Sequence, residues 1–136
     1  MKKPLNILLI EDDEIEIMKF NRVVSQIEEQ HTIKEVNNGE EAIEYLAENN
    51  SPDIILLDLN MPKMSGIEFL TYLKQHDTYK YIPTIILSTS DNPKDMMECY
   101  RIGIAGYRVK PLKYEGYVKN IHILIDYWAT NQIIKK

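Results

Sequence analysis

Short apolar runs alternate with stretches of helical periodicity along the chain, and this alternation constrains the fold more than any other feature. Strands are predicted at residues 6–10, 32–36, 53–57, 84–87 and 105–109. Helices are predicted to begin near residues 14, 38, 65, 92 and 114. Successive strands joined through helices run parallel, so the pattern predicts an α/β protein with a five-stranded parallel sheet and helices on both faces.

Local signals mark where the helices begin and end. The predicted signals are Asn38 as a cap with Glu41 reaching back to it, a capping box at Ser65, Asn92 before Pro93, and Gly103 as a stop. In the first helix, residues 14–27, the apolar positions Ile15, Met18, Val23 and Ile27 fall at helical spacing. Such spacing is typical of a helix that buries one face.

The length of 136 residues fits a single domain, residues 1–136. We expect a core at about residues 5–130, a short tail at residues 131–136 and no output domain, since the chain ends soon after its fifth helix. The net charge of −5 disfavours nonspecific binding to nucleic acid or to an anionic membrane surface. Cys99 is the only cysteine, and no export signal or membrane span is evident, so we expect a cytoplasmic protein.

Polar and charged residues follow the predicted strands at the edge where ligands bind in open parallel sheets. They are Glu11, Asp12 and Asp13 after the first strand, Asp58 and Asn60 after the third, Ser88, Thr89 and Ser90 after the fourth, and Lys110 after the fifth. Taken singly, these residues have ordinary explanations such as helix capping or exposed loop positions. Their coincidence at successive strand ends of one sheet favours a functional site.

Carboxylates brought together at one edge have a specific chemistry. Two of them about 4 Å apart repel by roughly 4 kcal/mol at an effective dielectric constant near 20, so the cluster favours a bound divalent cation. Oxygen ligands suit Mg²⁺ better than zinc. A metal-neutralised aspartate can attack phosphorus and form an aspartyl phosphate, whose negative charge Lys110 and Ser88 would stabilise.

Four stretches together resemble the response-regulator receiver family of two-component systems, over nearly the whole chain. They are Leu8-Leu9-Ile10-Glu11-Asp12-Asp13, the run from Asp53 to Pro62, Ile86-Leu87-Ser88-Thr89-Ser90, and Gly106-Tyr107-Arg108-Val109-Lys110-Pro111. The resemblance implies a flavodoxin-like, doubly wound (βα)5 fold with strand order 2-1-3-4-5. It also implies a stand-alone phospho-acceptor.

Carried over position by position, the resemblance assigns roles to these residues. Asp58 would accept the phosphoryl group, with Mg²⁺ held by Asp12 directly, by Glu11 largely through water, by Asp58 and by the backbone carbonyl of Asn60. Ser88 and Tyr107 would be the switch pair, while Lys110 and Thr89 would lie at the phosphoryl group. Asn60 and Ser90 match positions that tune dephosphorylation. The resemblance further implies a cis peptide bond between Lys110 and Pro111.

The implied function is a two-state switch driven by a sensor histidine kinase or a phosphotransfer protein. Phosphorylation would remodel a face made of the fourth helix, fifth strand and fifth helix, which would contact a downstream protein and could support a homodimer. The protein would not be an enzyme beyond its own phosphorylation and dephosphorylation. The C-terminal segment Ile125-Asp126-Tyr127-Trp128 resembles that of single-domain receivers that partner phytochrome-type sensor kinases. The resemblance assigns no role to Arg108 or Gly116.

Three other classes of function can be compared with these residues. A receiver-fold binding module that works without phosphate would be expected to lack the acceptor, the acidic pair or the lysine. A haloacid-dehalogenase-like phosphatase would need a second aspartate two residues after Asp58, where Asn60 stands. A flavodoxin-type FMN carrier would need a phosphate-binding loop after the first strand, where Glu11, Asp12 and Asp13 would repel phosphate.

Overall fold

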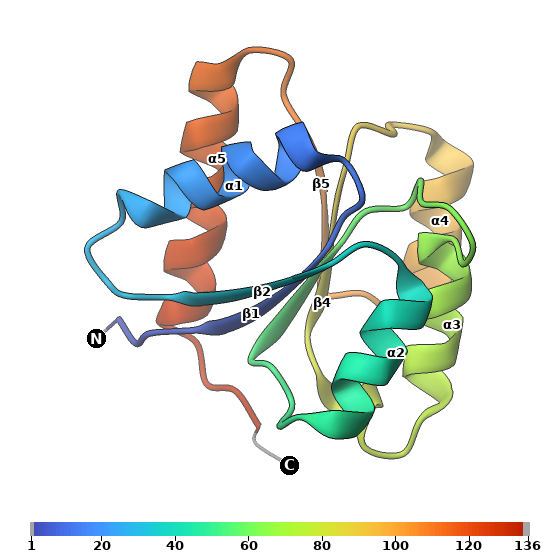
Figure 1. Cartoon of the computed structure of the whole chain (residues 1–136). Coiled ribbons are helices and arrows are strands. Elements are labelled where there is room, and N and C mark those ends of the chain that lie inside the picture. Colours follow the sequence, from blue (N-terminus) through green and yellow to red (C-terminus); the bar gives the residue numbers. More distant parts are fainter. Residues whose placement is uncertain (1, 135–136) are drawn as a thin grey trace.

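The computed structural model describes residues 2–134 and contains one parallel sheet in the order β2-β1-β3-β4-β5 (Figure 1). The strands are β1 (Asn6–Ile10), β2 (Thr32–Val36), β3 (Ile54–Leu57), β4 (Thr84–Ser88) and β5 (Gly106–Val109). The helices are α1 (Glu14–Ser25), α2 (Gly39–Glu48), α3 (Gly66–Gln75), α4 (Pro93–Ile102) and α5 (Tyr114–Ala129), with a short 3-10 helix at Tyr79–Tyr81. The predicted fold class and strand order are confirmed.

The sheet lies between two helical layers, and each layer closes its own apolar core (Figure 1). On one face, α1 and α5 cover alternate residues of β1, β3 and β4, and Phe20, Tyr117 and Ile125 are buried there. On the other face α2, α3 and α4 pack, and Leu46, Phe69 and Cys99 are buried. The central strands β1 and β3 are apolar on both faces because both faces are covered, as parallel sheets require.

The predicted helix caps are present, with one correction. Asn38 Oδ1 accepts from the Glu41 N–H at 3.0 Å, but Glu41 Oε1 reaches back to the N–H of Asn37 at 2.9 Å rather than to Asn38. The Ser65 capping box is complete, Asn92 caps α4 with Pro93 in the first turn, and Gly103 ends that helix at a φ of 126°. Only glycine takes such a positive φ without steric cost.

The face of α1 that packs on the sheet differs from the predicted stripe. Ile15 and Met18 are 68% and 70% exposed, whereas Ile17, Phe20 and Val24 are buried. The prediction is therefore wrong for Ile15 and Met18 and right for Val23, which is fully buried. Apolar side chains lie on both sides of this helix, and only contact with the sheet decides which of them is buried.

None of the helices in the described part of the chain is long and apolar enough to cross a lipid bilayer.

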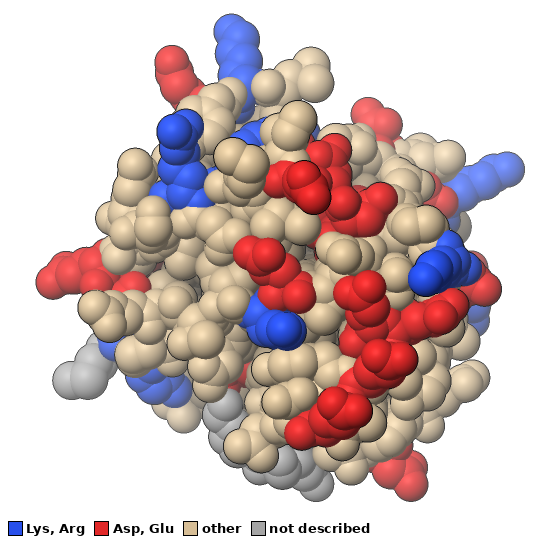
Figure 2. Space-filling model, viewed as in Figure 1, with Lys and Arg blue, Asp and Glu red and all other residues tan. Residues whose placement is uncertain are grey.

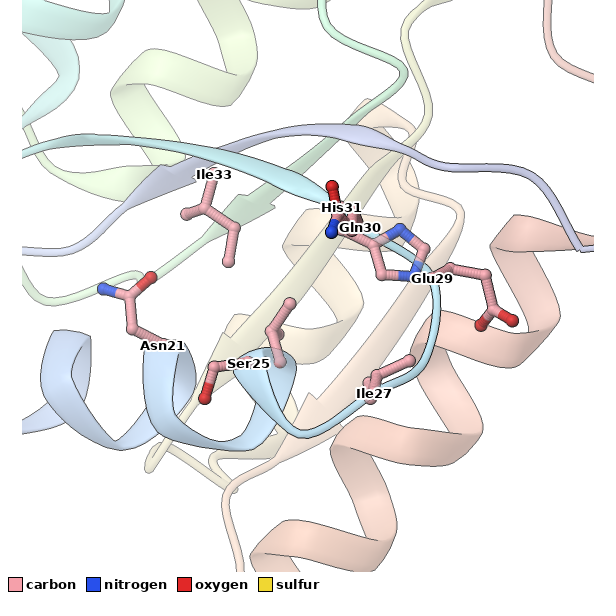
Figure 3. Close-up of a pocket in the computed structure, with 8 residues that line it drawn as sticks. Asn21, Ser25, Ile27, Glu29, Gln30, His31 and Ile33 are labelled. Carbon is pink, nitrogen blue, oxygen red and sulfur yellow. The ribbon is translucent and has the colours of Figure 1, made fainter.

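A hollow of about 410 Å³ lies at the amino edge of the sheet, between the end of α1 and the start of β2 (Figure 3). His31 lies beside it and accepts the Leu5 N–H through Nδ1 at 2.9 Å. Its proton is therefore on Nε2, which is buried and has no hydrogen-bond partner among the described residues. Burial lowers the pKa of His31, against the opposing charges of Glu29 and Asp126. The neutral ring is the form that this end of the fold accommodates.

We expect acid to destabilise the fold through His31. Because the pKa of the folded state lies below the unfolded value near pH 6.5, His31 stabilises the fold above that pH, and this contribution is lost as the pH falls. Protonation of Nδ1 would also break the bond from Leu5, worth about 1 kcal/mol. Urea unfolding above and below about pH 6.5 should show a smaller acid loss in His31→Gln than in wild type or in His122→Gln. An equal loss in all three would contradict the assignment.

Candidate functional site

The acids predicted from the strand ends converge at the carboxyl edge of the sheet. Ile10 and Leu57 are direct neighbours in the β1–β3 pairing, so the residues that follow them, Glu11 and Asp58, leave the sheet at the same level. Carboxylate oxygens of Glu11, Asp12 and Asp58 lie within 4.8 Å of one another. The chain reverses direction across the sheet between these two strands, which is where α/β proteins bind ligands.

Backbone bonds fix the two loops that carry these acids. The Glu11 N–H donates to the Val36 carbonyl at 3.0 Å, and the Asp58 N–H donates to the Ile10 carbonyl at 3.1 Å. The Asp13 side chain caps α1, accepting from the Ile15 N–H at 2.9 Å. Asp13 is therefore the N-cap of α1, and the cluster consists of the other three acids, Glu11, Asp12 and Asp58.

Lys110 is the cation of the site. Its side chain is 5% exposed, and its Nζ lies 2.7 Å from Glu11 Oε1 and 3.1 Å from Glu16 Oε1. Its backbone N–H donates to the Ser88 carbonyl at 2.7 Å, which extends the β4–β5 pairing by one residue. The predicted cis bond to Pro111 is wrong, since every peptide bond among residues 2–134 is trans. The trans form is the intrinsically favoured isomer before proline, by about 0.5–1 kcal/mol.

Burial and charge shift the ionisation of the site. Burial raises the pKa of Asp58, and Asp12 raises it further, while Lys110 and the Ser88 hydroxyl act in the opposite direction. Burial alone would lower the pKa of Lys110, but Glu11 and Glu16 outweigh it, so the pKa is raised and the ammonium stays charged. The site thus holds more negative charge than one lysine balances.

The remaining predicted residues line the same edge. Ser88 is fully buried, and its Oγ accepts the Ser90 N–H at 3.2 Å. Ser90 Oγ donates to Asp95 Oδ2 of α4 at 2.9 Å, and the Tyr107 hydroxyl donates to the Ser90 carbonyl at 2.9 Å. Ser90 therefore links the end of β4 to α4 and β5. The predicted switch residues Ser88 and Tyr107 are joined through it.

The cleft at this edge has a volume of about 280 Å³. It is lined by Glu11, Asp12, Asp13, Glu16, Asp58, Asn60, Thr89 and Lys110. All its ligand atoms are oxygens, and three carboxylates are close enough to share one ion. Hard cations such as Mg²⁺ and Mn²⁺ prefer such ligands, and they also offset carboxylate repulsion. The residues therefore fit a divalent cation.

Two residues at this edge were not predicted from the sequence. Glu16 lies on the first turn of α1, five residues after Glu11, and no strand-end pattern points to it. Gly66 follows the capping residue Ser65, and a Cβ there would lie 2.5 Å from the carbonyl oxygen of Asp58 and 2.7 Å from Cα of Leu59. The loop that leaves Asp58 therefore folds directly against the start of α3.

Substitution of Gly66 tests this contact. The nearest atoms are backbone, which cannot move aside as a flexible side chain could, so Gly66→Ala is expected to destabilise the fold by roughly 1–3 kcal/mol. The displaced Asp58 carbonyl should also weaken divalent-cation binding, measured by calorimetric titration. Gly106→Ala is the control, since its Cβ would meet ordinary van der Waals contact at 3.9 Å. Equal behaviour of the two variants would contradict the role given to Gly66.

The two residues without a predicted role both contact neighbouring segments. The Arg108 guanidinium donates to Asn120 Oδ1 and so joins β5 to α5. A Cβ on Gly116 would lie 3.2 Å from Cβ of Pro111, so glycine lets the first turn of α5 approach the segment after Lys110. Both residues help to hold the β5–α5 connection beside the site.

Charge on the viewed surface is unevenly distributed (Figure 2). Acidic side chains gather over α2, whose exposed glutamates are Glu40, Glu41, Glu44 and Glu48, and lysines and arginines are scattered on this face. A broad basic surface, which binding to a phosphate backbone requires, does not appear in this view.

The sheet order, the three converging acids and the buried lysine define the receiver class of α/β proteins. The family model of the response regulator receiver domain matches residues 7–122, and the chain belongs to this family. The nitrate/nitrite response regulator protein NarL of Escherichia coli (strain K12) is 35% identical over 89% of the chain. The chain spans 55% of the length of NarL.

Two solved structures are similar over nearly their whole length. The phosphorylated cyanobacterial phytochrome response regulator RcpA has a TM-score of 0.90 and 31% identity, covering 96% of this chain and 98% of RcpA. The Mn²⁺-bound form of the response regulator Rcp1 has a TM-score of 0.90 and 28% identity, covering 96% of this chain and 99% of Rcp1. Rcp1 of Synechocystis sp. (strain ATCC 27184 / PCC 6803 / Kazusa) is a curated relative.

Proposed function

We propose that this receiver domain accepts a phosphoryl group on Asp58 from a sensor histidine kinase or a phosphotransfer protein, with Mg²⁺ as cofactor. The observation that carries the proposal is the convergence of Glu11, Asp12 and Asp58 within 4.8 Å beside Lys110. In this arrangement Asp58 is the only one of the three acids that follows the central strand β3. The similarity to phosphorylated RcpA supports the same function.

Each residue of the cleft has a part in this reaction. Glu11, Asp12, Asp58 and the backbone carbonyl of Asn60 would hold Mg²⁺, which supplies charge neutralisation for the attacking carboxylate. The Asp58 carboxylate oxygen would attack phosphorus while the donor histidine leaves, and Lys110 with the Ser88 hydroxyl would stabilise the charge on the phosphoryl oxygens. Thr89, Ser90 and Asn60 would control access of water and thereby the lifetime of the acyl phosphate.

The output surface would be the face formed by α4, β5 and α5. Exposed apolar and aromatic side chains gather on these elements, among them Met97 at 75%, Tyr100 at 56% and Tyr127 at 61% exposure. A hollow of about 540 Å³ lies among Tyr100, Tyr107 and Tyr127. Since Tyr107 bonds to the Ser90 carbonyl, movement of Ser88 and Ser90 toward a phosphoryl group would change this face for a downstream protein or a second copy. We place these events in the cytoplasm.

Intact-protein mass spectrometry tests the proposal. Wild-type protein incubated with acetyl phosphate or phosphoramidate should gain one phosphoryl group in Mg²⁺ and none in chelator. Treatment with hydroxylamine should remove the group, because it cleaves acyl phosphates and spares phosphate esters. Absence of any gain in folded, Mg²⁺-loaded protein, also with a panel of phosphorylated histidine kinases, would overturn the proposal. A phosphate-independent binding module would then be the better explanation.

A further inference from the structure

Lys110 has two carboxylate partners, and one of them lies outside the three-acid cluster. The Nζ atom contacts Glu11, which belongs to the cluster, and Glu16, which comes from the first turn of α1. Both carboxylates are mostly buried, with side-chain exposures of 5% and 20%. The Lys110 ammonium donates a hydrogen bond to Glu11 and forms an ion pair with Glu16, so the two glutamates hold Nζ on the α1 side of the cleft.

Glu16 is itself held in place by a second cation. Its other oxygen, Oε2, lies 3.4 Å from Lys19 Nζ, and that ammonium lies 4.5 Å from the centre of the Tyr117 ring. Tyr117 is a fully buried residue of α5 and cannot move without opening the core between α1 and α5. The Glu16 carboxylate is therefore a fixed negative charge beside the Lys110 ammonium rather than a mobile surface acid.

We infer that Glu16 is a positioning residue that restrains Lys110 and so slows phosphorylation of Asp58. This inference rests on the proposed function. A phosphoryl group on Asp58 needs an N–H donor from Lys110, and Nζ must give up or share its contacts to provide one. Glu16 competes for that ammonium in the resting protein. Unlike Glu11, it is not among the three acids that can share a cation, so binding of the metal does not remove it from the competition.

Three variants separate the effect of the Glu16 contact with Lys110 from the effect of the Glu16 charge. Glu16→Gln removes the charge, Glu16→Asp keeps the charge but shortens the side chain by one methylene, and Glu14→Gln removes a charge from an exposed acid in the same helical turn. With acetyl phosphate and Mg²⁺, both Glu16 variants should be phosphorylated about 3–10-fold faster than wild type, where tenfold corresponds to 1.36 kcal/mol. Glu14→Gln should remain near the wild-type rate.

A second readout reports on Lys110 without any phosphorylation. The ¹H–¹⁵N resonance of the Lys110 ammonium, assigned by its loss in Lys110→Met, should shift in both Glu16 variants and remain in place in Glu14→Gln. If Glu16→Asp matches wild type in rate and resonance, charge alone acts and the positioning role is overturned. Wild-type rates in both Glu16 variants would overturn it too. Failure of wild type to gain phosphate would instead defeat the proposed function, and the resonance would then decide whether Glu16 positions Lys110.

Discussion

Replacing Asp58 with asparagine is expected to stabilise the fold while it abolishes acceptance of the phosphoryl group. Burial and the Asp12 carboxylate raise the pKa of Asp58, so the charged form is less favourable in the folded than in the unfolded protein. With a raised folded-state pKa, the carboxyl group stabilises the fold only at acid pH, and at neutral pH its charge is a penalty. Asparagine keeps the shape and removes that charge.

We expect Asp58→Asn to raise the free energy of unfolding at neutral pH in metal-free buffer, because the variant lacks the charge that burial and Asp12 disfavour. The gain should shrink as the pH falls toward the pKa of Asp58. Mg²⁺ should stabilise wild type more than the variant, because the variant has lost one carboxylate of the cluster.

Urea unfolding with and without Mg²⁺ measures the stability change, and intact mass after acetyl phosphate measures acceptance. Asp91→Asn, at an exposed aspartate outside the lining of the cleft, is the matched control and should change neither quantity. A destabilised Asp58→Asn would contradict the assignment of electrostatic strain to this carboxylate. A phosphorylated Asp58→Asn would contradict the assignment of the acceptor.

The order of strands and helices could be predicted because each strand is a short apolar run that ends at a polar residue. Which face of α1 packs on the sheet could not be predicted. Its sequence places apolar residues at 15 and 18 as well as at 17, 20 and 24, so two stripes with helical spacing overlap. The sheet and α5 cover the second stripe and leave Ile15 and Met18 exposed, a choice that depends on tertiary packing.

The acids and the lysine of the site could be predicted because parallel strands bring their carboxyl ends to one edge. Glu16 and Gly66 could not, because each acts through a contact between elements. Glu16 contacts Lys110 across 94 positions of sequence. Gly66 is needed because a Cβ at this position would lie 2.5 Å from a backbone carbonyl oxygen. Such contacts leave no periodic signal in the sequence.

Replacing Lys110 with methionine is expected to cause the largest loss of both stability and function. The buried ammonium pairs with Glu11 and Glu16, and methionine of similar length would leave both carboxylates without it. Loss of one partner from a buried ion pair typically costs about 3–5 kcal/mol, because the remaining charge is uncompensated. Phosphoryl acceptance should fall about 100-fold, as when one donor to a developing oxyanion is removed.

The pH and metal dependence of Lys110→Met identify the cause of this loss. Burial raises the pKa of Glu11, so acid protonates it and should reduce the difference in unfolding free energy between variant and wild type. Mg²⁺ should recover part of the stability, because it supplies positive charge to the same acids. Lys113→Met, at an exposed lysine beside α5, should change unfolding by less than about 0.5 kcal/mol.

A double variant shows whether Lys110→Met loses stability because the attraction between Lys110 and Glu11 is gone or because the Glu11 charge is left buried without a partner. Glu11→Gln combined with Lys110→Met removes both partners of the 2.7 Å contact, and it should be more stable than Lys110→Met alone. The loss of unfolding free energy that remains relative to wild type would then come from Glu16, which still lacks its contact with Lys110. If the double variant is less stable than either single variant, Lys110 stabilises the fold by packing rather than by charge, and its burial would have to be explained without the acids around it.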